Sequence, residues 1–182
     1  MKIYTFLAEG FETVEALGVV DVLRRGGVEV VTVSISENKI VESKQEVPVV
    51  SDKIFAECDF SDGDGLFLPG GIPGTDNLKA HEGLIGLLKQ YNEAGKYIAA
   101  ICAAPTVLGV NGMLDGKNAT CYPGCEEELY GAEYTASDVE MDGNIITSKG
   151  MGTTIALGLK MLELFVNETM AENIGKAIMY LK

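Results

Sequence analysis

Short apolar runs alternate with longer amphipathic stretches from the start of the chain. Residues 2–7 form an apolar run typical of a buried strand, and residues 11–25 carry apolar side chains at helical spacing until two glycines stop the pattern. A β-branched run follows at residues 28–35. A strand, a helix and a second strand in this order predict a β-α-β unit, and therefore a parallel sheet with a right-handed crossover.

Two further buried strands are expected, each ending at an unusual residue. Residues 65–68 end at a Pro-Gly-Gly turn, and residues 98–101 end at Cys102. Helical patterns surround the second of these strands, at residues 75–81, 84–94 and 105–110. The β-α rhythm of the opening unit therefore continues through this part of the chain.

The rest of the sequence pattern predicts short antiparallel hairpins and helices in the C-terminal part of the chain. Residues 40–43 and 47–50 are short and interrupted by Pro48, which favours a small hairpin or edge extension. A second hairpin is expected at residues 139–147, where glycine supplies the turn. The other expected elements are a strand at 117–122 and helices at 126–130, 155–165 and 169–181. Together these elements predict a flavodoxin-like three-layer α/β sandwich with a mainly parallel central sheet, formed by one domain spanning residues 1–182.

Composition and charge narrow the choice of partners. The 182 residues are 47% hydrophobic, which suits one substantial core, and the net charge of −13 disfavours nucleic acid and anionic membrane surfaces. No segment has the length of a membrane span or of a signal-peptide core. We therefore expect a cytoplasmic protein with a small-molecule or protein partner, whose four cysteines stay reduced.

Cys102 is the leading candidate for chemistry. It stands where a predicted strand ends and a helix begins at Pro105, so the positive end of that helix favours a thiolate with a lowered pKa. The alternative is a small buried hydrophobe, as most free cysteines are. Pro-Gly-Gly at residues 69–71 is equally compatible with an ordinary turn or with backbone N–H groups of Gly71 and Ala103 directed at an oxyanion.

Glu15 is the candidate partner of this thiol. On a helical wheel it falls in an apolar sector, where desolvation raises a carboxyl pKa and suits the group to move protons. The alternative is a solvated surface residue. A metal site at Cys121 and Cys125 is disfavoured because only one histidine, His81, exists in the chain and it lies elsewhere. Cys121 is kept as an auxiliary group that resolves an oxidised Cys102 if the two are close.

With these residues in view, the chain resembles the DJ-one/ThiJ/PfpI superfamily, and most closely its DJ-one branch. The matching motifs stand in family order at residues 12–15, 21–26, 68–71 with 77–78, 99–105 and 147–153. The resemblance implies a flavodoxin-like homodimer that needs no cofactor. It also implies that Cys102 is a reactive, oxidisable thiol, that Glu15 is its carboxyl partner, and that Gly71 and Ala103 are backbone donors.

The resemblance further implies a glyoxalase or deglycase that acts on small α-oxoaldehydes such as methylglyoxal. The rival class is a redox-sensing or chaperone-like stress protein that uses the same cysteine with little turnover. Two positions depart from the family pattern. Tyr122 stands where the branch commonly has a histidine, and a tyrosine is the weaker acid–base group near neutrality. Ala103 stands where protease-like members have a histidine, which disfavours peptidase activity.

Overall fold

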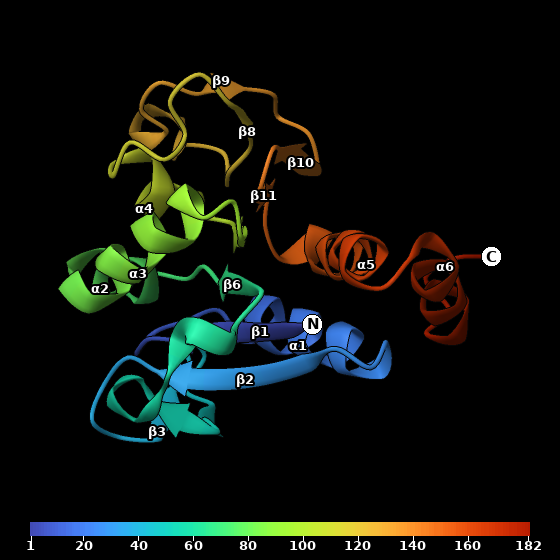
Figure 1. Ribbon diagram of the computed structural model, residues 1–182, viewed down its shortest axis with the longest axis horizontal. Coiled ribbons are helices and arrows are strands. Elements are labelled where there is room, and N and C mark those ends of the chain that lie inside the picture. Colours follow the sequence, from blue (N-terminus) through green and yellow to red (C-terminus); the bar gives the residue numbers. More distant parts are fainter.

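A seven-stranded sheet forms the centre of the protein, whose computed structural model describes residues 1–182 (Figure 1). Its strand order is β10-β11-β7-β6-β1-β2-β5, and every neighbouring pair is parallel except β10 and β11. The strands of this sheet are β1 (Lys2–Leu7), β2 (Glu29–Ser34), β5 (Lys53–Ile54), β6 (Gly65–Leu68), β7 (Tyr97–Ile101), β10 (Val139–Asp142) and β11 (Ile145–Ser148). Apart from β10, the carboxyl ends of these strands therefore lie at one edge of the sheet.

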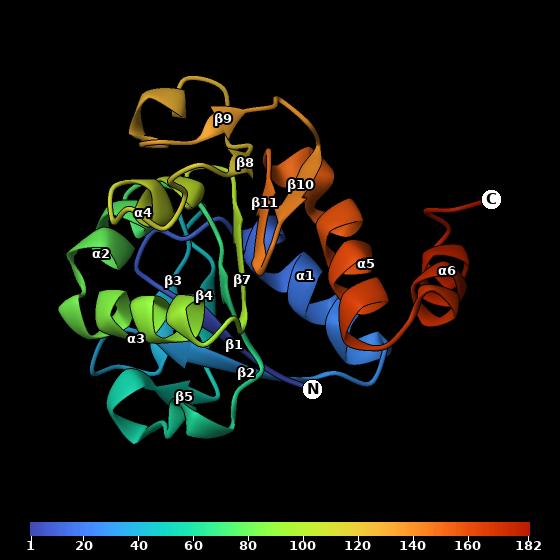
Figure 2. The same ribbon diagram turned by 45° about the horizontal axis from the view of Figure 1, so that its top comes forward.

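Helices cover both faces of the sheet (Figure 2). The helices are α1 (Thr13–Arg25), α2 (Gly74–Ala80), α3 (Glu82–Glu93), α4 (Pro105–Gly109), α5 (Thr154–Phe165) and α6 (Glu168–Ala177). On one face α1 packs against α5, and α6 packs on the outer side of α5. Side chains of α2, α3 and α4 form a separate apolar core on the other face. The expected three-layer α/β sandwich is confirmed.

Some elements differ from the sequence expectation. The strand expected at residues 117–122 is wrong in extent: only β8 (Asn118–Ala119) forms, and it pairs with β9 (Glu133–Tyr134) outside the main sheet. Strand β10 occupies the position beside β11 at the edge of that sheet, so residues 117–122 do not join it. The two-residue strand β5 was not expected, and the final helix ends at Ala177, earlier than its pattern indicated. No helix combines the length and apolar character needed to cross a bilayer.

The predicted hairpin of β3 (Ile40–Glu42) and β4 (Pro48–Val50) is confirmed, and it braces the start of α1. The N–H of Gly10 donates to the carbonyl of Glu42 at 2.9 Å, and the N–H of Lys44 donates to the carbonyl of Phe11 at 2.9 Å. The Thr13 hydroxyl also donates to that of Ser43 at 2.7 Å. These bonds fix the first turn of α1 against the edge of the sheet where the strands end.

Candidate functional site

Four neighbouring strands bring the candidate residues to one edge of the sheet. Strands β1, β6, β7 and β11 are adjacent and parallel, so the residues that follow them meet there. Those residues are Glu15 in α1, Gly70 and Gly71 after β6, Cys102 after β7, and Gly150 and Met151 after β11. Sheet topology therefore joins segments that lie far apart in the chain.

Cys102 sits in a sharp turn between β7 and α4. Its φ of 65° is in the left-handed region, which is uncommon for a residue with a side chain. Backbone bonds hold this conformation: its N–H donates to the carbonyl of Ser148 at 2.9 Å, and its carbonyl accepts the N–H of Tyr122 at 2.8 Å. The N–H groups of Ala103 and Gly71 both donate to the thiol sulfur. The sulfur is therefore held by two amides, at a strained position that its neighbours fix.

Glu15 points from the first turn of α1 toward this thiol. Its side chain is only 1% exposed, and the thiol of Cys102 donates to its carboxylate. Its carboxylate Oε2 accepts the N–H of Gly70 at 3.0 Å, and the carboxylate also accepts the N–H of Met151. Glu12 caps the same helix by accepting the N–H of Glu15 at 2.7 Å. We refer to the two reacting side chains as the Cys102–Glu15 pair.

The pair has unusual acid–base properties because it is buried. Burial is the largest cause that raises the pKa of Glu15 to about 7, and the negative charge of Glu12 adds to it. Burial, followed by the charge of Glu15, raises the pKa of Cys102 to about 12. The N–H donors of Ala103 and Gly71 lower that pKa but do not outweigh these causes. The expected lowering of the thiol pKa by the helix terminus was therefore wrong, and the helix itself, α4, has only five residues.

A half-buried thiol beside a buried carboxyl still provides a nucleophile. When the thiol passes its proton to the Glu15 carboxylate, the pair keeps a single negative charge, and that charge moves to sulfur. The alternative, a thiolate beside a carboxylate, places two charges in a desolvated space. The arrangement therefore suits a reaction in which Glu15 receives the thiol proton as sulfur attacks.

The auxiliary candidates occupy different positions around the pair. Tyr122 is bound to Cys102 through its backbone, and its half-exposed ring lies beside Gly150. Cys121 is fully buried in the core on the opposite face from the one that Cys102 packs against. Burial raises its pKa to about 12. Tyr122 thus lies beside the site. Cys121 does not, because it is linked to Cys102 only through the backbone hydrogen bond of the adjacent Tyr122.

Sequence reasoning missed the contribution of the segment after β11. The Ser148 carbonyl and the Met151 N–H bind the two members of the pair directly. The available signal was the glycine-containing stretch 148–152 that follows a predicted strand, which is the same signal that identified residues 70–71 and Cys102. No group of three or more His, Cys, Asp or Glu side chains is arranged to hold a metal ion.

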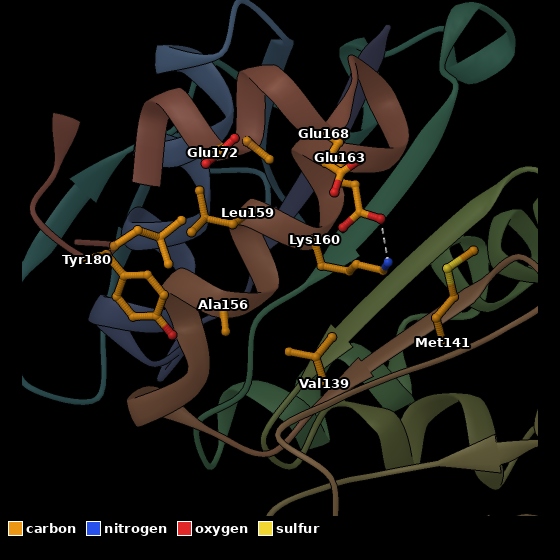
Figure 3. Close-up of a pocket in the computed structure, with 11 residues that line it drawn as sticks. Val139, Met141, Ala156, Leu159, Lys160, Glu163, Glu168, Glu172 and Tyr180 are labelled. Atoms are coloured by element: carbon orange, nitrogen blue, oxygen red, sulfur yellow. Dashed lines mark hydrogen bonds and ion pairs between the residues drawn. The ribbon is translucent and has the colours of Figure 1, made fainter. Parts of the chain in front are cut away.

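A groove that is separate from the pair lies on another part of the protein. It encloses about 470 Å³ between β10, α5 and α6, and Figure 3 shows Val139 and Met141 on one side of it and Tyr180 on another. Lys160 crosses part of the groove and forms an ion pair with Glu163 at 2.8 Å. It contains no thiol and no histidine.

Comparison with known proteins identifies the family of the chain. A family model described as the DJ-1/PfpI family matches residues 1–164. The chain belongs to the DJ-1/PfpI family. Protein DJ-1 homolog A of Arabidopsis thaliana is 36% identical over 176 residues, which are 95% of this chain and 45% of that protein. Protein dj-1beta of Drosophila melanogaster is 35% identical over 176 residues, covering 95% of this chain and 94% of that protein. The chain thus spans less than half of the Arabidopsis relative and nearly all of the Drosophila one.

Solved structures of the DJ-1/PfpI family share the whole fold. The structure titled "Toxoplasma gondii DJ-1, oxidized" superposes with a TM-score of 0.95 at 32% identity, covering 100% of this chain and 99% of that one. A more distant relative, named as a deglycase of Pyrococcus abyssi, is 29% identical over 158 residues, which are 86% of this chain and 94% of that protein. One relative of the chain is therefore named as a deglycase.

Proposed function

We propose that the protein is a cysteine-dependent enzyme that converts small α-oxoaldehydes such as methylglyoxal to 2-hydroxy acids without a cofactor, or removes them from their adducts. The observation that carries the proposal is the close approach of the Cys102 side chain to the buried carboxyl of Glu15, whose oxygen borders the same space beside Gly70. The deglycase relative supports the same substrate class. The surrounding backbone donors supply what the charged intermediates need.

The reaction proceeds in three steps. Sulfur attacks the aldehyde carbon while the thiol proton passes to Glu15 and then to the aldehyde oxygen, which gives a hemithioacetal. Glu15 next removes the proton from that carbon and returns a proton to the adjacent carbonyl carbon through an enediol, which leaves a 2-hydroxy thioester. Water hydrolyses the thioester and regenerates the thiol, so the net change is the addition of one water. The N–H groups of Gly71 and Ala103 face the sulfur and are placed to stabilise the oxygen anion next to it.

The test measures lactate formation from methylglyoxal at pH 8. Cys102→Ser is expected to abolish turnover, and Glu15→Gln to reduce kcat at least a hundredfold because the proton cannot move between the two carbons. Asp21→Asn is the matched control, since it changes an exposed carboxylate further along the same helix that pairs with Arg25, and it should stay within about twofold. Turnover that survives Cys102→Ser would exclude the proposed site.

A second candidate function is redox sensing through Cys102. The donors that face the sulfur, together with a protonated Glu15, are also suited to hold the oxygens of a cysteine sulfinate. Mass spectrometry of the peroxide-treated protein distinguishes the two functions. Selective oxidation at Cys102 in a protein that shows no turnover favours the sensor over the enzyme.

We also propose that the protein is a cytoplasmic homodimer. All four cysteines are free, as expected of a reducing compartment. The paired residues Ile40 and Val50 on the β3–β4 hairpin expose large apolar side chains, and Val14 does so on the helix that the hairpin braces. Exposed apolar side chains on neighbouring elements are typical of an interface.

A further inference from the structure

Three residues with large apolar side chains lie in the backbone segments that contact the reacting pair. Tyr122 donates its N–H to the carbonyl of Cys102 at 2.8 Å, and Met151 donates its N–H to the carboxylate of the pair. Ile72 directly follows Gly71, whose N–H faces the sulfur. We call Ile72, Tyr122 and Met151 the apolar rim.

The rim side chains are exposed although they are apolar. Their exposed fractions are 46% for Ile72, 54% for Tyr122 and 56% for Met151. A single exposed hydrophobe is ordinary on a protein surface. Three of them beside one nucleophile form a contact surface at the place where a substrate must enter.

The ring of Tyr122 lies beside the carboxyl group of the reacting pair. A Cβ atom added to Gly150 would lie 3.4 Å from Cδ2 of the Tyr122 ring and 4.0 Å from Oε1 of Glu15. The ring and the carboxylate therefore border the same small space, which stays open because Gly150 has no side chain. A group attached beside the reacting carbonyl of a substrate reaches this space, and a flat aromatic group can pack on the ring.

Charge at the mouth disfavours an anionic substituent. Lys149 precedes Gly150, but its amino group is paired with the carboxylate of Asp138 at 3.4 Å. The charge of Glu12 acts on Glu15, and the chain as a whole carries −13. A phosphate or carboxylate on the substrate would therefore meet negative potential at this edge.

From these observations we infer that the apolar rim, and Tyr122 above all, selects α-oxoaldehydes with a neutral, bulky apolar substituent, aryl in preference to methyl. This inference rests on the proposed function and specifies its substrate class. Phenylglyoxal and methylglyoxal are the two probes, because they share the reacting dicarbonyl unit and differ only in the substituent that faces the rim.

The experiment compares kcat and KM for both probes in the wild type, Tyr122→Ala, Tyr122→Phe and Tyr130→Ala. Tyr122→Ala is expected to lower kcat/KM about tenfold for phenylglyoxal, mainly through KM, and less than twofold for methylglyoxal. Tyr122→Phe keeps the ring and should retain the wild-type ratio. Tyr130 is also an exposed tyrosine but lies outside the rim, so Tyr130→Ala should leave kcat/KM unchanged for both substrates.

The outcomes separate this inference from the function on which it rests. The inference is overturned if Tyr122→Ala loses kcat/KM equally for both probes, or if Tyr122→Phe behaves like Tyr122→Ala. Turnover by the wild type supports the proposed function in either case. Absence of turnover with either probe in the wild type overturns both. Met151→Ala provides a second variant: its ratio of phenylglyoxal to methylglyoxal activity should fall in the same direction, and an unchanged ratio removes Met151 from the rim.

Discussion

The carboxylate of Glu15 lies where a side chain of Gly70 would otherwise be. The N–H of Gly70 donates to Oε2 of Glu15 at 3.0 Å. A Cβ atom on Gly70 would lie 2.7 Å from that oxygen and 2.6 Å from the Cβ of Cys102. Gly70 therefore has two roles at the Cys102–Glu15 pair. Its N–H donates a hydrogen bond to the carboxylate, and its lack of a side chain leaves the space in which the thiol and the carboxyl meet.

Replacing Gly70 by alanine tests this relationship. We expect Gly70→Ala to lower the free energy of unfolding by about 2 kcal/mol, because the added methyl group overlaps atoms that the backbone holds in place. Turnover should fall with it, since the carboxyl must move away from the sulfur. Gly86→Ala is the control: this exposed residue of α3 has nothing within 4 Å of an added Cβ, so alanine should stabilise the helix by up to about 1 kcal/mol. Urea denaturation of both variants gives the comparison, and similar values for the two would refute the steric account.

The raised pKa of Glu15 predicts a pH-dependent cost in stability. Its folded-state pKa of about 7 lies above its ordinary value of 4.5, so between these pH values the folded protein keeps a proton that the unfolded chain has lost. The contribution of this group to stability is therefore greatest below pH 4.5 and decreases as the pH rises to 7, by up to about 3 kcal/mol.

Glu15→Gln removes this titration. The unfolding free energy of the wild type minus that of the variant should fall as the pH rises across the same window, and urea denaturation at several pH values measures it. Parallel curves for the two proteins would show that Glu15 does not titrate with a raised pKa.

The left-handed conformation of Cys102 predicts an unusual ranking of substitutions. Because its φ is 65°, a residue with a Cβ is strained there and glycine is not. Cys102→Gly should therefore be more stable than Cys102→Ala by about 1 kcal/mol in chemical denaturation. At Cys58, where φ is −96°, the order should reverse. The same order at both positions would contradict the assignment of strain to Cys102.

The sequence pattern predicted the fold well because strands buried on both sides leave continuous apolar runs. It also placed Cys102 and the glycines of residues 70–71 at strand ends, and from there at one edge of the sheet. It did not predict β5, since two residues carry no periodicity, and it extended β8 because the residue types at 117–122 do not show whether a sheet edge is free. The donor role of Met151 was also beyond the pattern, because a backbone N–H leaves no trace in residue type.

The proposed homodimer gives the last prediction, because its surface is defined by adjacent side chains. Val50 is 70% exposed and pairs with the exposed Ile40 across the hairpin. A carboxylate at this position would be desolvated in an interface but free in a monomer, so Val50→Asp should weaken association at least a hundredfold in sedimentation experiments. Tyr130→Asp adds the same charge at another exposed site and should leave association unchanged. If Val50→Asp associates as tightly as the wild type, the hairpin is not the interface; if the wild type sediments as a monomer at micromolar concentration, the homodimer itself is excluded.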